Sequence, residues 1–151
     1  MPVLKSLLPL AVLLLLGACK SRDAAPPAAE TSDCGQPIRV RHPLPRLTSD
    51  FFRVADASVE GLCLSVTVAA TGCGSEGWSA ALHTDGLVAE SSPTQTQALL
   101  VFDDGVGEDG ITCQAIVEQT FTFDLSPYLT EASLPTVFRL TGTEITLTIK
   151  R

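Results

Sequence analysis

The sequence LCLSVTV at residues 62–68 decides the fold, because its apolar residues stand at even positions and its small or polar residues at odd positions. A period of two sends alternate side chains to opposite faces of an extended strand. The same alternation recurs at 111–123 and again at 145–150. These three stretches therefore predict strands that each bury one face and expose the other.

The stretch 111–123 carries the longest alternating pattern. One face is predicted to hold Ile111, Cys113, Ala115, Val117, Phe121 and Phe123, and the other Thr112, Gln114, Glu118, Thr120 and Thr122. Weaker alternation predicts further strands at Phe51–Ser58, Trp78–Thr84, Ala98–Asp103 and Val137–Thr141. A hairpin turn is expected at Gly142.

Helical patterns are weak along the chain, and the frequent threonines favour strands over helices. A short helix is expected at most at Ser126–Ala132, where Pro127 suits the first helical position. Pairs such as Asp85-Gly86 and Asp104-Gly105 predict turns between the strands. We therefore predict an all-β domain, an antiparallel β-sandwich or a small barrel, of about seven to nine strands.

The N-terminus has the layout of a secretory signal peptide at residues 1–18. Lys5 precedes an apolar run at 7–16, which is shorter than the roughly 20 residues that span a bilayer as a helix. The mean hydropathy of the whole chain, +0.28, is partly due to this segment. Export is the expected fate of the protein.

The sequence Leu16-Gly17-Ala18-Cys19 at the end of the apolar run resembles the lipobox of bacterial lipoproteins. The resemblance implies that Cys19 is thioether-linked to diacylglycerol and becomes the first residue after cleavage. An ordinary signal peptide with a free Cys19 is the alternative, and a membrane helix is disfavoured by length. Lys20 stands where an Asp retains lipoproteins in the inner membrane of enteric-type bacteria, so we expect the outer membrane, facing the periplasm or the cell surface.

Residues 19–33 are predicted to be a lipidated, disordered tether. After Cys19 they contain no large apolar side chain and are rich in Pro, Ala, Ser and acidic residues. Such a segment cannot bury enough surface to order itself. The β domain is accordingly expected at 34–151.

Four cysteines follow Cys19, and an exported compartment favours their pairing as two disulfides. Three pairings are open, and we favour Cys73–Cys113 together with Cys34–Cys63. A zinc site or a catalytic redox pair would favour a C-x-x-C spacing, which the sequence lacks.

Charge is unevenly distributed. Ten Lys and Arg stand against 17 Asp and Glu, which excludes the basic surface of a nucleic-acid binder. No Lys or Arg occurs at 54–138, whereas that segment holds twelve acidic residues. The basic residues of the first and last strands are expected to form one patch. We favour an acidic, solvated surface over a field that steers a cationic ligand.

The sequence DDGVGEDG at 103–110 is the densest acidic cluster. It joins two predicted strands, so its glycines indicate a turn. Its candidate calcium ligands are Asp103, Asp104, Glu108 and Asp109, since Ca²⁺ takes six to eight oxygens. The order of an EF-hand loop is absent, and we favour the interpretation without a metal.

No catalytic pattern stands out. His42 follows an arginine-rich stretch, and His83 alternates with Trp78, Ala80 and Leu82, which predicts that His83 points outward into solvent. Nucleophile-elbow, zinc-protease, phosphate-loop and dinucleotide motifs are absent. The sequence predicts neither a catalytic residue nor a cofactor.

A second resemblance covers residues 71–129. Gly72-Cys73, then Asp109 with Cys113-Gln-Ala115, then the sequence FTFDLSP at 121–127, are similar to a pattern in small uncharacterised bacterial envelope lipoproteins. A histidine closely follows the first cysteine in that pattern, whereas SEGW stands here at 75–78. The resemblance implies the Cys73–Cys113 pairing and no activity.

Three functions are weighed from these features. The favoured one is a non-enzymatic binding or structural module, held at the membrane by lipid on Cys19. The alternative is an inhibitor of a cationic envelope-directed enzyme such as a lysozyme, which the acidic middle of the chain would attract. A small hydrolase is the second alternative, motivated by acidic residues and an exposed histidine.

Overall fold

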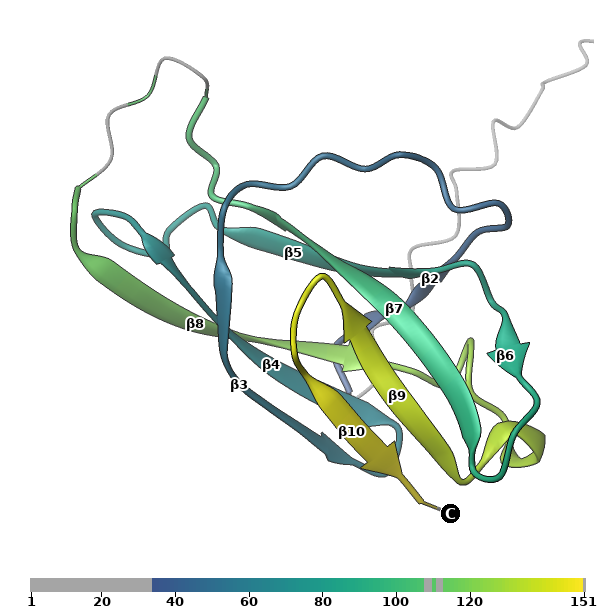
Figure 1. The fold of residues 1–151 in the computed structure, drawn as a ribbon. Helices are drawn as coiled ribbons and strands as arrows, with labels where there is room; N and C mark the ends of the chain where they lie inside the picture. The colour runs from purple at the N-terminus through teal and green to yellow at the C-terminus, as the bar shows by residue number, and fades with distance from the viewer. Residues whose placement is uncertain (1–33, 108–109, 111–112, 151) are drawn as a thin grey trace, which may run out of the picture.

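The computed structural model describes residues 34–107, 110 and 113–150, and in them the chain forms a β-sandwich (Figure 1). Seven strands have four or more residues: β3 Arg53–Glu60, β4 Cys63–Thr71, β5 Ser79–Thr84, β7 Thr94–Asp103, β8 Ile116–Asp124, β9 Thr136–Thr141 and β10 Thr146–Ile149. Three have two: β1 Gln36–Pro37, β2 Arg39–Val40 and β6 Val88–Ala89. A short 3-10 helix, η1, covers Glu131–Ser133. The all-β sandwich prediction is thus confirmed.

Residues 63–68 form most of β4, which lies between β8 and β3 in the four-stranded sheet. The strand order of that sheet is β1-β8-β4-β3. In β4, Leu64, Val66 and Val68 are at most 1% exposed, while the threonine and serine between them face outward. β4 pairs antiparallel with β8 from Cys63↔Asp124 to Thr71↔Ile116. The alternation of residue types therefore sets which face of β4 enters the core.

The six-stranded sheet has the order β10-β9-β7-β5-β2, with β6 pairing β7. The pairs β3–β4, β4–β8, β5–β7 and β9–β10 are antiparallel, as predicted, and β1–β8, β2–β5 and β7–β9 are parallel. Parallel strands need a crossover between them. Between β7 and β9 the chain crosses to the other sheet, forms β8 there and then returns. Because each sheet contains both parallel and antiparallel pairs, both sheets are mixed.

The core lies between the two sheets and gathers around Phe102 of β7, which is 1% exposed. Its ring centroid lies 5.1 Å from that of Trp78 in an edge arrangement, and 6.5 Å from that of Phe121 on the opposite sheet. Phe123 and Phe138, which the alternation also places inside, are fully buried. Aromatic rings from both layers thus join the sheets.

Some predicted boundaries are wrong. β8 begins at Ile116, so Cys113–Ala115 lie outside the strand, and Ile111 and Thr112 lie outside the described residues. The predicted helix at 126–132 is replaced by a turn followed by η1. The hairpin turn at Gly142 is confirmed, with a φ of 82° that suits glycine.

Both favoured disulfides are present. Cys34, at the start of the described chain, is bonded to Cys63 at the start of β4. Cys73, after β4, is bonded to Cys113, which precedes β8. The first bridge ties the N-terminal end of the domain to its central strand, and the second closes the far end of the β4–β8 pair.

A segment that we call the strap, residues 41–50, connects β2 to β3 across the outer face of the six-stranded sheet. At its start the Arg41 backbone nitrogen donates to the Thr84 carbonyl, 2.9 Å. At its end the Asp50 nitrogen donates to the carbonyl of Phe102, 2.9 Å, and Ser49 Oγ accepts from the Phe102 nitrogen. The strap therefore lies over β5 and β7 (Figure 1).

Candidate functional site

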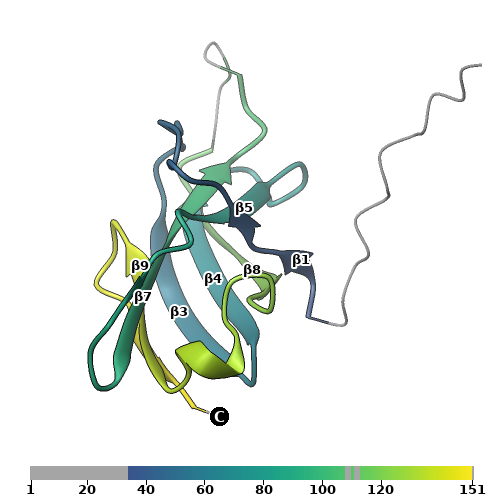
Figure 2. The ribbon, with the colours of Figure 1, turned by 90° about the vertical axis from the view of Figure 1, so that its right-hand side faces the viewer.

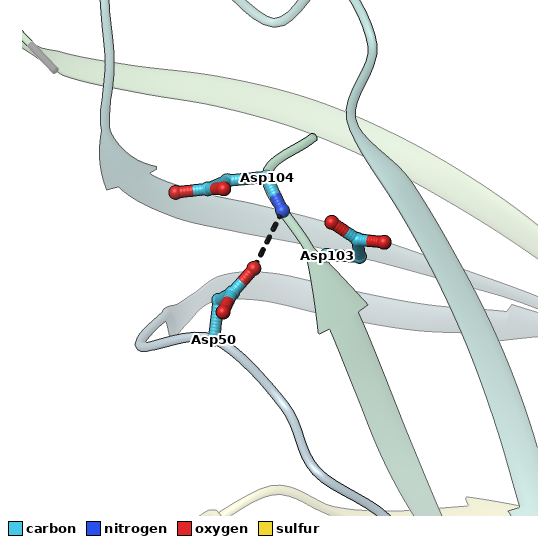
Figure 3. Close-up of side chains that lie close together, drawn as sticks. All are labelled: Asp50, Asp103 and Asp104. Atoms are coloured by element: carbon cyan, nitrogen blue, oxygen red, sulfur yellow. Dashed lines mark hydrogen bonds between the residues drawn. The ribbon is translucent and has the colours of Figure 1, made fainter. Parts of the chain in front are cut away.

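An acidic cluster lies where the strap meets the end of β7. Ligand oxygens of Asp50, Asp103 and Asp104 all lie within 4.8 Å of one another. Asp50 Oδ2 accepts a hydrogen bond from the Asp104 backbone nitrogen at 2.9 Å (Figure 3). The structure thus brings together two of the predicted calcium candidates and adds Asp50, while Glu108 and Asp109 lie outside the described residues.

The side chains of the cluster are accessible to solvent: Asp50 and Asp103 are exposed, and Asp104 is half-buried. Asp103 Oδ1 accepts from the Gly105 nitrogen and Asp104 Oδ1 from the Val106 nitrogen, each at 2.8 Å, so one oxygen of each carboxylate closes a turn. Figure 3 shows the Asp103 and Asp104 side chains leaving the strand end in different directions. Since Ca²⁺ takes six to eight oxygens, three carboxylates engaged in this way make an incomplete donor set.

Sequence reasoning missed Asp50 because its partners lie more than 50 residues further along the chain. It joins the cluster through the strap, whose path depends on the outer face of the six-stranded sheet. No local pattern around Asp50 marks this proximity. Its position between Thr48-Ser49 and Phe51-Phe52 indicates a loop and nothing more.

Beside the cluster is a cavity of about 640 Å³, which we call the acidic hollow. It lies between the β4–β5 loop and the end of β7, and its lining residues are Thr71, Gly72, Cys73, Gly74, Ser75, Glu76, Trp78, Asp104 and Val106. The Cys73–Cys113 bridge anchors one wall. Glu76 and Asp104 supply negative charge to the lining, and none of the lining residues that the structure describes is Lys or Arg.

His83 does not point into solvent, so that prediction is wrong. Its position opposite the core face is as the alternation predicts, but the strap covers this part of the outer face, and His83 is 5% exposed. With Leu44 of the strap and Thr141 of β9 it lines a small cavity of about 100 Å³. Its Nδ1 is buried and has no hydrogen-bond partner among the described residues.

Burial lowers the pKa of His83 below its usual value, and the positive charges of Arg39 and Arg41 lower it further. The neutral imidazole is therefore the form that fits this site near pH 7. The cavity is also smaller than the roughly 300 Å³ at which ligand pockets begin. The exposed histidine that motivated the hydrolase alternative is thus not exposed in the fold.

The basic residues do not form one patch, contrary to the expectation from the sequence. β2, with Arg39, and β10, followed by Lys150, stand at opposite edges of the six-stranded sheet. Arg53 of β3 lies on the other sheet, where its Nη2 is 3.4 Å from Glu118 Oε1. The two edge strands lie on opposite sides of the sandwich because three strands of the same sheet, β9, β7 and β5, separate them.

Tyr128 is a buried residue that the sequence analysis did not single out. Its hydroxyl donates to the Leu87 carbonyl, and it accepts from the Gln97 nitrogen at 3.4 Å. Burial raises the pKa of Tyr128, against a smaller lowering from its hydrogen bond to Thr84. The side chain thus acts as a buried phenol that holds the β5–β6 loop to the sheet.

The predicted lipid attachment at Cys19, with the signal peptide and the tether, falls outside the described residues. From Cys34 onward, none of the described segments is a helix that is long and apolar enough to cross a bilayer. The acylation of Cys19 therefore stays a prediction.

Comparison with known proteins supports the fold. No protein-family model matches the chain, and no curated protein matches it. A solved structure of a protein of unknown function, DUF1344, from Bacteroides vulgatus is similar, with a TM-score of 0.51 and 15% identity. The similarity covers 77% of this chain and 56% of that one, so this chain spans little more than half of its length. At this identity the likeness concerns the β-sandwich architecture alone.

Proposed function

We propose that this protein is a lipid-anchored component of the bacterial envelope, a non-enzymatic binding or structural module held at the outer membrane. The order of features along the chain carries the proposal. A lipobox cysteine is followed by 14 residues without a large apolar side chain, and then by Cys34, which is disulfide-bonded to the central strand. The proposed lipid anchor, the spacer and the disulfide-bonded domain thus follow one another directly along the chain.

Each part has a physical role in this proposal. Two or three acyl chains hold a protein stably at a bilayer, where one chain binds marginally. A spacer of 14 residues reaches about 50 Å when fully extended, which sets the distance at which the domain can bind a partner. The disulfides stabilise a small domain in an oxidising compartment.

The anchor is tested by labelling cells with a radioactive fatty acid and by fractionating their membranes. We expect the wild-type chain to incorporate label, the Cys19→Ser variant to lose it entirely, and the Ser21→Ala variant to keep it. Label retained by Cys19→Ser, or absent from the wild type, would contradict the proposal.

The acidic hollow favours a second candidate, an inhibitor of a cationic envelope-directed enzyme. Glu76 and Asp104 lie in its lining, and Asp50 and Asp103 lie beside it. Four carboxylates at one end of the sandwich attract a basic protein surface and raise its association rate. The cavity would receive a side chain from such a partner.

This candidate is tested by binding hen lysozyme, as a cationic probe, to the mature chain at low and at high salt. We expect binding at low salt that Asp103→Asn with Asp104→Asn weakens at least tenfold, because asparagine keeps the turn hydrogen bonds and removes the charge. Asp56→Asn with Glu60→Gln, on β3, is the matched control. Equal weakening by both pairs would exclude a site at the acidic hollow.

A further inference from the structure

Two large apolar side chains are exposed on neighbouring segments, β2 and the loop after β5. Val40 of β2 is 44% exposed, and Leu87, after β5, is 57% exposed. Gly86 joins them, since a Cβ placed on it would lie 3.0 Å from Val40 Cγ1. Most large apolar residues of this small domain are buried, so a neighbouring exposed pair indicates a contact surface.

The backbone that presents this pair is firmly held. Val40 pairs with Thr84 in the six-stranded sheet. The Leu87 nitrogen donates to Asp85 Oδ1 at 3.0 Å, and the Leu87 carbonyl accepts from the Tyr128 hydroxyl. The exposed side chains therefore stand on fixed backbone rather than on a loop free to fold them inward.

Arginines alternate with Val40 along this edge of the sheet, so their side chains stand on the opposite face from Val40, beside His83. Arg39 and Arg41 flank Val40 in the chain, and Arg46 follows in the strap; all three are exposed. Among the described residues, the salt bridge found is between Arg53 and Glu118, and neither of these residues belongs to this surface. Two acidic residues lie nearby, and their carboxylates accept from backbone nitrogens: Asp85 from Leu87 and Asp124 from Ser126.

This surface lies where the spacer enters the domain. Arg39 is five residues after Cys34, and Figure 2 shows β1 on the side of the sandwich away from β9. The acidic cluster is at the other end of β5, since Arg39 pairs with His83 whereas Asp103 pairs with Ser79. Four residues of strand separate these positions by about 13 Å.

We propose that Arg39, Val40, Arg41 and Leu87 form a docking patch for the anionic phospholipid surface to which the chain is anchored. The proposal rests on the lipid anchor proposed above and adds an orientation to it. Arginines bind phosphate headgroups while Val40 and Leu87 enter the interface between headgroups and acyl chains. The acidic hollow then faces away from the membrane, because its charge is repelled by the same lipids.

Lipid binding by the patch is measured on the mature chain carrying Cys19→Ser, so that no acyl chain contributes. The probes are vesicles of phosphatidylcholine alone and of phosphatidylcholine with an equal amount of phosphatidylglycerol, at low salt. We expect at least tenfold more protein on the anionic vesicles, and loss of this excess at high salt, where charges are screened within a few ångströms. Equal binding to both vesicles, or no binding to either, would overturn the proposal.

Variants locate the contact. Each basic residue near an anionic surface changes partitioning by about fivefold, so Arg39→Gln with Arg41→Gln is expected to reduce binding about 25-fold. Arg53→Gln with Lys150→Gln, on β3 of the other sheet and after β10 at the far edge from β2, is the charge-matched control and should stay within twofold of the parent. Similar losses in both pairs would show a general charge effect and refute the patch.

A second pair of variants tests how much the exposed apolar side chains contribute to lipid binding. Leu87→Ser is expected to weaken binding several-fold, whereas Ile116→Ser, which alters a residue 60% exposed on β8, should leave it unchanged. Unfolding midpoints of all variants check that the fold is kept. Because none of these chains is acylated, a failed patch leaves the fatty-acid labelling of Cys19 unaffected, and failed labelling leaves the vesicle result interpretable.

Discussion

At the scale of the residue, His83 shows how a surface position becomes a buried one. The imidazole lies on the outer face of β5, where the strap covers it, and its Nδ1 has no partner among the described residues. The positive charges of Arg39, on the neighbouring strand β2, and of Arg41, at the start of the strap, disfavour protonation of the ring. Protonation of His83 is thus disfavoured in the folded protein and unopposed in the unfolded chain.

This arrangement predicts a loss of stability in mild acid. Since the pKa of His83 is lowered in the folded state, the unfolded state binds the proton more readily, and the free energy of unfolding falls as pH drops below about 6.5. The loss from one group is at most about 1.4 kcal/mol per pH unit. Urea unfolding between pH 7.5 and pH 5 measures it.

The His83→Gln variant should show a shallower decline than the wild type over that range. His42→Gln, which alters an exposed histidine, is the control and should decline as the wild type does. If His83→Gln and the wild type declined in parallel, the burial of a neutral His83 would be wrong.

Two phenylalanines of opposite exposure test the core directly. Phe102 is 1% exposed among three other aromatic rings, whereas Phe51 is 93% exposed. We expect Phe102→Ala to lower the free energy of unfolding by about 3–5 kcal/mol. Phe51→Ala should change it by less than about 0.5 kcal/mol. Chemical denaturation of both variants gives the comparison, and comparable losses would contradict the placement of Phe102.

At the scale of the element, β8 shows why an alternating pattern alone does not define a strand. The pattern begins at Ile111, but the partner β4 ends at Thr71, opposite Ile116. One more backbone hydrogen bond, from the Gly72 nitrogen to the Ala115 carbonyl at 3.0 Å, extends the contact. Beyond it Cys113 is bonded to Cys73, which holds the chain against the β4–β5 loop.

The β9–β10 hairpin allows a prediction at the same scale. Gly142 has a φ of 82°, a conformation that costs a residue with a Cβ about 1 kcal/mol or more. Gly142→Ala is therefore expected to lower the free energy of unfolding by about 1–2 kcal/mol. Gly74→Ala is the control, because Gly74 has ordinary φ and open space around its Cβ. Thermal unfolding of the two variants, if equal, would argue against a strained turn at Gly142.

At the scale of the whole molecule, two disulfides join segments that the sheets bring together from a distance. Cys34–Cys63 and Cys73–Cys113 bridge residues 29 and 40 apart in the sequence. The first secures the end of the domain at which the described chain begins, and the second secures the end that carries the acidic hollow. The two functional proposals thus concern opposite, separately stapled ends of one sandwich.

Loop-closure entropy predicts similar contributions from the two bridges, roughly 3.6 kcal/mol for the shorter loop and roughly 3.9 kcal/mol for the longer one. Cys34→Ser with Cys63→Ser, and Cys73→Ser with Cys113→Ser, should each lower the free energy of unfolding by about that amount. Urea unfolding under non-reducing conditions measures both. A double variant as stable as the wild type would show that its bridge does not constrain the unfolded chain.

Much of the fold was predictable because alternation is local. The stretch 62–68 predicts its own buried face, and 145–149 does the same, since side-chain direction along a strand depends only on position. The acidic loop after Asp103 was also predictable from its glycines and carboxylates. Its third carboxylate, Asp50, was not, because the strap that brings it there is defined by packing against another strand.

By itself the sequence determined that this chain builds strands and that its charges are divided between an acidic middle and basic ends, and its resemblance to a lipobox predicts acylation of Cys19. Tertiary structure alone decided which strands pair, which are parallel, and that β2 and β10 lie at opposite edges. It also decided that His83 is covered. The physical reason is that strand pairing and burial depend on segments distant in the chain, whereas a local pattern specifies only which way each side chain points.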